Sequence, residues 1–144
     1  MKNYMQSAND YYRHFIQPRD FVEFSSGYFL SEGLFRISGE TQCYWLLQII
    51  CFQEKAGGQQ LMEFWNLKRT EGLEYLLQCR DSSGNALFEN TFISPDFLFD
   101  EITIWKMGSY LILPTEYNEF VKLIKNDAVN HPSKKTDDLK IELN

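Results

Sequence analysis

The apolar and polar positions change their period near the middle of the chain. Residues 43–53 form an almost continuously apolar run that includes two of the three cysteines. A helix that is apolar on every side must be covered on several faces, so this run predicts a helix buried at the centre of a fold. We expect the helix to extend from Thr41 to Lys55 and to end at residues 56–58 (AGG), because glycines commonly terminate helices.

Beyond Gly58 the pattern alternates, which is typical of strands with one buried face. In residues 73–80, apolar side chains occupy every second position from Leu73 to Cys79, which predicts a half-buried antiparallel strand. Polar turns with glycine at residues 70–72 and 81–85 favour hairpins and a simple meander. Further strands are expected at residues 61–69, 87–93, 102–106 and 110–113.

Short helices are expected at both ends. Residues 7–16 can form the first helix, with Ser7 or Asn9 as its cap, and Pro114 opens a last helix that carries an apolar stripe. Residues 21–37 remain ambiguous, because residues 25–27 (SSG) interrupt the pattern and residues 30–34 can be either a turn or a helix start.

These elements predict one α+β domain over residues 1–125. Its antiparallel sheet of four or five strands would pack against the central apolar helix, with the terminal helices flanking it. A chain of this length buries about two thirds of its unfolded surface, which suits a single core. Residues 126–144 are polar and aperiodic, so we expect a mobile C-terminal tail in which residues 139–143 could still pair with an edge strand.

Composition and charge narrow the classes of function. The chain is 44% hydrophobic and 16% aromatic, which excludes a disordered protein. Its net charge of -6 and pI of about 4.9 offer no general attraction to nucleic acid or to an anionic membrane, so partners with basic surfaces fit better. No apolar run approaches the roughly 20 residues that span a bilayer, and we expect a cytoplasmic protein with reduced thiols.

No catalytic, cofactor or metal-binding set stands out in the sequence. The two histidines are His14 and His131, and the second lies in the predicted tail. Cys43 and Cys51 share one helical face, but no neighbouring His or Cys pair completes a zinc site. Residues 57–58 (GG) follow a helix, whereas a phosphate-binding loop precedes one. We therefore expect no catalytic residue, cofactor or metal ion, and favour binding over catalysis.

Two sets of side chains are candidates for binding. The first is an acidic surface that could occupy a basic groove on another protein, although a solvated acidic face without a partner would look the same. Its members are Glu71, Glu74, Asp81, Glu89, Asp100, Glu101, Glu116 and Glu119. The alternative is an aromatic pocket between helix and sheet for a small molecule, as a binding domain or a small enzyme. Its members are Tyr44, Trp45, Trp65 and Asp96.

Five motifs in one order resemble an uncharacterised bacterial family. They are residues 30–34 (LSEGL, similar to its Thr-Asp-Gly-Val segment), 43–47 (CYWLL, its Tyr-Trp-Leu-Leu/Ile-Asp helix), 64–67 (FWNL, its Gln-Val-Trp-Lys-Leu), 94–97 (SPDF, its Tyr-Thr-Asp-Phe-Pro) and 113–117 (LPTEY, its Leu-Pro-Ser-Glu-Tyr). Residues 11–14 (YYRH) also resemble the family's start, and Gln53 matches the closing glutamine of its helix. Gln48 departs from the pattern, because the family carries an aspartate there.

On these motifs the chain is identified as a member of the domain-of-unknown-function family 6876, found in bacteria and often carried on phages, plasmids and other mobile elements. The family has no established activity to transfer, so the resemblance implies a context: an accessory protein of a mobile element. Some small acidic proteins of such elements, including anti-CRISPR proteins, inhibit host defence nucleases. We expect a protein that binds a partner with a basic surface, such as a nucleic-acid-processing enzyme. An uncovered sheet edge could also join two copies.

Overall fold

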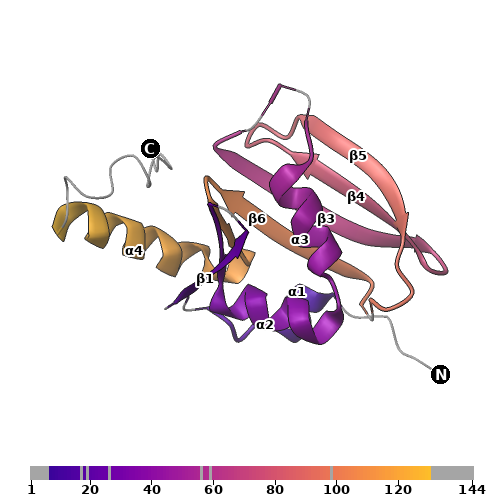
Figure 1. Cartoon of the computed structure of the whole chain (residues 1–144), viewed down its shortest axis with the longest axis horizontal. Helices are drawn as coiled ribbons and strands as arrows, with labels where there is room; N and C mark the ends of the chain where they lie inside the picture. The colour runs from indigo at the N-terminus through magenta and orange to yellow at the C-terminus, as the bar shows by residue number, and fades with distance from the viewer. Residues whose placement is uncertain are drawn as a thin grey trace.

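The computed structural model describes residues 7–16, 18, 20–25, 27–55, 57–58, 60–97 and 99–130, the last five of these by their backbone only. Within this part of the chain, seven strands form one mixed sheet, accompanied by four α-helices and a short 3-10 helix (Figure 1). The predicted tail lies mostly outside the described residues, although the last helix continues through residues 126–130.

The half of the sheet that ends at β5 is an antiparallel meander, to which a later strand returns. Strands β3 (Met62–Glu71), β4 (Glu74–Arg80) and β5 (Ala86–Ile93) follow one another, as their alternation predicts. Strand β6 (Glu101–Met107) then pairs with the opposite side of β3 instead of adding to β5. A hairpin at Gly108 leads into β7 (Tyr110–Ile112).

The remaining two strands come from the segment that the sequence left ambiguous. Strands β1 (Phe21–Ser25) and β2 (Tyr28–Ser31) form a hairpin through Gly27, whose φ of +83° suits glycine. Strand β2 pairs in parallel with β7, which gives the order β1-β2-β7-β6-β3-β4-β5. The predicted antiparallel sheet of four or five strands around a central helix is therefore wrong. The turn residues that seemed to interrupt residues 21–37 instead join two short strands.

The expected helix at residues 41–55 is part of a helical pair. Helix α2 (Glu32–Thr41) ends where Gln42 adopts a left-handed conformation with φ 59° and its N–H bonds to the carbonyl of Ser38. Helix α3 (Tyr44–Phe52) follows and holds the apolar run. Helix α1 (Ala8–Tyr11) is capped by Ser7, as predicted, and the 3-10 helix η1 (Pro114–Glu116) opens α4 (Tyr117–Asn130).

The two faces of the sheet are covered differently. Helices α1, α2 and α3 share one core with the inward rows of β3, β4 and β6, including Trp65, Tyr75 and Ile104. On the other face, Phe120 and Ile124 of α4 pack in a smaller cluster near β6 and β7. In Figure 1, α4 extends away from β4 and β5, and no other described helix lies on that side. Met62 and Phe64, at the start of β3, pack against this smaller cluster. The outer face of β4, β5 and the remainder of β3 is open over the described part of the chain.

None of the described helices is long and apolar enough to span a bilayer.

Candidate functional site

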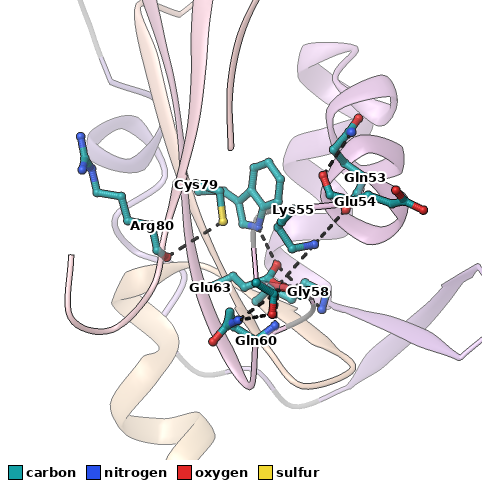
Figure 2. A network of polar contacts seen from close by, with 11 residues as sticks. Gln53, Glu54, Lys55, Gly58, Gln60, Glu63, Cys79 and Arg80 are labelled. Atoms are coloured by element: carbon teal, nitrogen blue, oxygen red, sulfur yellow. Dashed lines mark hydrogen bonds and ion pairs between the residues drawn. The ribbon is translucent and has the colours of Figure 1, made fainter. Parts of the chain in front are cut away.

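A network of buried charges fastens the loop between α3 and β3 to the sheet (Figure 2). The carboxylate of Glu63 is completely buried and is approached from two sides. Its Oε1 accepts a hydrogen bond from the Trp65 indole at 3.1 Å, and its Oε2 accepts one from the Gln60 backbone at 3.0 Å. The Nζ of Lys55 lies 3.3 Å from Oε2, and that of Lys106 lies 3.9 Å from Oε1.

Both ammonium groups are buried with the carboxylate. Lys55 also donates to the carbonyl of Gln53 at 2.9 Å, which holds the end of α3 against the network. Burial lowers the pKa of Lys106, while the charge of Glu63 opposes that shift. Two cations that share one carboxylate in a dry environment depend strongly on it. With its oxygens engaged by the surrounding donors, Glu63 serves to position the loop.

The three cysteines are free thiols that lie buried in the protein. Burial raises the pKa of Cys43 to about 11 and those of Cys51 and Cys79 to about 12, so all three remain protonated. Among the described residues, no group of three or more His, Cys, Asp or Glu side chains is arranged to hold a metal ion.

A cavity of about 550 Å³ opens beside the start of α2, within the size range of small-ligand pockets. It combines aromatic, basic and acidic groups contributed by α2, η1 and the segment that follows α1. The lining residues are His14, Phe15, Ile16, Glu32, Gly33, Arg36 and Glu116. Three segments that carry the family resemblance, residues 11–14, 30–34 and 113–117, thus contribute to one cavity.

Glu116 is the one buried carboxylate of this cavity. Its Oε1 accepts a hydrogen bond from the Leu113 backbone at 2.8 Å, and the Ser31 hydroxyl donates to the same carboxylate. Burial raises the pKa of Glu116, although these hydrogen bonds oppose the shift. Ser31 also accepts from the Leu34 backbone at 3.1 Å as the cap of α2. Glu116 therefore ties η1 to α2, and it is too deeply buried to contribute to the predicted acidic surface.

Four of the predicted acidic residues meet at one end of the sheet. Glu71 and Glu74 face each other across the β3–β4 hairpin, and Glu101 pairs in register with Lys68. The neighbouring Asp100 forms an ion pair of 2.7 Å with Arg69.

The other predicted acidic residues lie elsewhere. Glu89, on β5, accepts a hydrogen bond from Gln78 of β4 at 3.0 Å, on the open face of the sheet. Asp81 lies in the β4–β5 turn, where bonds from Asn85 and Ser83 lower its pKa. Glu119 pairs with Lys122 on α4, apart from these strands.

The four residues of the predicted aromatic pocket have separate surroundings. Tyr44 is 42% exposed and stacks on Phe24, while the ring of Trp45 lies 5.5 Å from that of Phe92. Trp65 is buried and donates its indole N–H to Glu63, and Asp96 is exposed in the β5–β6 loop. None of the four lines the cavity beside α2.

Sequence reasoning missed the buried charges and the cavity. A signal for the buried charges was present, because Glu63 lies two residues from Trp65, and Lys106 two residues from Ile104, on the same inward rows of their strands. A charge at such a position indicates a buried ion pair. The cavity carries no comparable signal, since its residues come from three distant segments.

Comparison with known proteins identifies the family. Residues 6–117 match the model of DUF6876, a family of unknown function, so the chain belongs to that family. No match is found among the curated proteins or among the solved structures.

Proposed function

We propose that this member of a family of unknown function binds another protein through the acidic outer face of its sheet and does not act as an enzyme. The acidic outer face is defined by Glu71, Glu74, Glu89 and Glu101. These carboxylates lie on or beside the rows of β3–β6 that point away from the core, where no helix of the described chain covers β4, β5 or the part of β3 that follows Phe64.

The observation that carries the proposal is the sign of the charge on this open face. Lys68 and Arg80 belong to the same outward rows, but the carboxylates outnumber them. The whole chain is also acidic, with a net charge of -6. A basic protein surface would therefore be attracted and oriented by this face, mainly through a faster association rate.

The family resemblance supports a finer proposal. In the cytoplasm of a bacterial host, an accessory protein of a mobile element would meet nucleic-acid-processing enzymes, including defence nucleases. Such enzymes hold phosphates in basic grooves. The acidic outer face would occupy such a groove in place of phosphates and inhibit the enzyme.

The proposal is tested by affinity capture from a lysate of a bacterial host, using the tagged full-length chain and mass spectrometry. The double variant Glu74→Lys/Glu101→Lys reverses the charge of the acidic outer face. A matched control, Glu23→Lys/Glu54→Lys, changes the net charge equally at exposed acidic residues outside that face. We expect a basic nucleic-acid-processing protein to bind the wild type and the control, and to be lost at least about tenfold from the face variant.

Two results would contradict this function. If both double variants lose the captured protein equally, net charge alone governs the interaction. If neither loses it, the partner binds elsewhere. A captured enzyme that retains full activity when saturated with the chain would leave binding intact but refute inhibition.

The cavity beside α2 supports a second candidate function, the binding of a small molecule. The cavity is large enough for a small molecule. Its lining offers a polar ligand the guanidinium of the exposed Arg36 and the carboxyl groups of the exposed Glu32 and the buried Glu116. A ligand that binds only the folded state raises the melting temperature, so a thermal-shift screen of metabolites and nucleotides is the test. A compound that stabilises the wild type but not Arg36→Ala would favour this function, and a screen without any shift would count against it.

A further inference from the structure

Strand β5 forms one edge of the sheet. The strand order ends with it, so within the described part of the chain only β4 pairs with its backbone. It is eight residues long, and no described segment continues the sheet beyond it in Figure 1. An edge of this length presents a row of unpaired backbone groups that can template another strand.

The register shows which backbone groups face outwards. The Ser94 N–H donates to the carbonyl of Leu73, the residue directly opposite, at 3.0 Å, so the backbone groups of Ser94 point towards the β4 side. In an antiparallel ladder, successive residues point their backbone groups alternately towards and away from the neighbouring strand. The backbone groups of Glu89, Thr91 and Ile93 therefore point away from β4. The Thr91 N–H accordingly bonds to the side-chain oxygen of Asn90, at 2.8 Å, and not to β4.

We propose that a second copy of this chain pairs with the β5 edge, antiparallel and centred on Asn90. A two-fold axis through Asn90 places Glu89 opposite Thr91 of the second copy, and Leu87 opposite its Ile93. Glu89, Thr91 and Ile93 have outward-pointing backbone groups, whereas Leu87 lies at a register shift in the β4–β5 ladder. The two pairs of Glu89 with Thr91 can therefore form about four ladder hydrogen bonds. The two sheets would continue as one, with their core faces on the same side.

The side chains of β5 are complementary in this register. On the core face, Phe88 lies opposite Phe92 of the second copy, and aromatic cross-strand pairs are favourable. Both rings are only partly buried in one copy. The ring centroid of Phe88 lies 5.7 Å from that of Trp65, and the ring centroid of Phe92 lies 5.5 Å from that of Trp45. Pairing would cover their open edges.

The alternative registers of a symmetric pair are less favourable. A centre at Glu89 places that carboxylate opposite itself, and like charges in this position repel. A centre at Thr91 sets Phe92 opposite Asn90, which breaks up the aromatic pairs. The register centred on Asn90 avoids both conflicts. Since two paired strands bury less than a standard interface, we expect a dissociation constant on the order of micromolar.

Sedimentation equilibrium of the full-length chain provides the first test. Thr91→Glu places a carboxylate opposite Glu89 of the second copy, twice by symmetry, whereas the matched variant Thr91→Lys places an ammonium there. Thr91 is exposed, so neither change disturbs the core. We expect Thr91→Glu to dimerise at least about tenfold more weakly than Thr91→Lys. Equal dissociation constants for the two variants would overturn the register.

Cross-linking provides the second test. In Asn90→Cys the two new thiols would lie close together in a pair without ladder bonds, a spacing that suits a disulfide. The native cysteines are all buried, and an exposed control, Ser83→Cys, lies in the turn far from the axis. We expect Asn90→Cys to form covalent dimers under mild oxidation much faster than Ser83→Cys.

Equal cross-linking rates would overturn the pairing at Asn90. If the wild-type chain sediments as a monomer at a concentration about 100 times the expected dissociation constant, the dimer itself is overturned. The same result is expected if residues 139–143 of the chain pair with the β5 edge in place of a second copy. These outcomes do not depend on whether the acidic outer face binds a basic protein.

Discussion

Replacing Glu63 with glutamine is the sharpest test of the buried network. The substitution keeps the size of the side chain and one carbonyl oxygen, so the hydrogen bond from Trp65 or Gln60 can persist. It removes the negative charge that the buried ammonium groups of Lys55 and Lys106 share at 3.3 and 3.9 Å. Both ions would then remain in a dry environment without this counter-charge.

The expected loss is large relative to the stability of the fold. Removing one partner of a buried ion pair costs about 3–5 kcal/mol. A folded domain is typically stable by about 5–15 kcal/mol, so Glu63→Gln should leave a much less stable protein. An exposed carboxylate serves as control: Glu89→Gln affects a side chain bonded to Gln78 on the surface, and we expect a change within about 0.5 kcal/mol.

Urea unfolding followed by tryptophan fluorescence measures both free energies. The double variant Glu63→Gln/Lys55→Met also removes the buried ammonium group of Lys55, so it should be more stable than Glu63→Gln alone. A loss below about 1 kcal/mol for Glu63→Gln would refute the reasoning, because the carboxylate would then contribute no more than an ordinary hydrogen bond.

Three further predictions concern the cavity and the thiols. Gly33→Ala should lower the free energy of unfolding in urea by about 1–3 kcal/mol, because the new Cβ would lie 2.9 Å from Glu116 Oε2 and 3.1 Å from Phe15. Gly39→Ala in the same helix should stay within about 1 kcal/mol of the wild type, and equal losses for the two variants would contradict the crowding at Gly33. Burial raises the pKa of Glu116 above 4.5, so its contribution to stability is full below pH 4.5 and is lost as the pH rises through the raised value. Unfolding free energies of Glu116→Gln should therefore fall less than those of the wild type between pH 4.5 and neutral pH, and parallel curves would refute the shift. The three cysteines should resist a thiol reagent in the native protein and all react in urea, and a fast native reaction would show that one of them is accessible.

Local patterns were sufficient for most individual elements. Alternation predicted β3, β4, β5, β6 and β7 within a few residues, because a strand with one buried face must place apolar side chains at every second position. Ser7 was recognised as a cap and Pro114 as the start of a helical segment, since both roles depend on the adjacent backbone alone.

The candidate site was less predictable than the elements. Four of the eight predicted acidic residues lie on strands of the sheet, because polar positions of an alternating strand face solvent. Glu116 is buried and does not join the predicted acidic surface. Its partners Leu113 and Ser31 are brought to it only where η1 packs against the start of α2, which the sequence pattern does not specify. The expected grouping of Tyr44, Trp45, Trp65 and Asp96 depended on helix and loop positions that alternation does not specify.

The sequence by itself determined the length, the strand pattern and the acidic balance of this protein, because each is a property of single residues or of near neighbours. Only the tertiary structure decided that β6 returns to β3, that β2 runs parallel to β7, and that Glu63 and Lys106 meet in the interior. Alternation fixes which side chains share a face of a strand, but it does not fix the neighbour of that strand. That choice depends on contacts between segments far apart in the chain, which also leave β5 as an open edge.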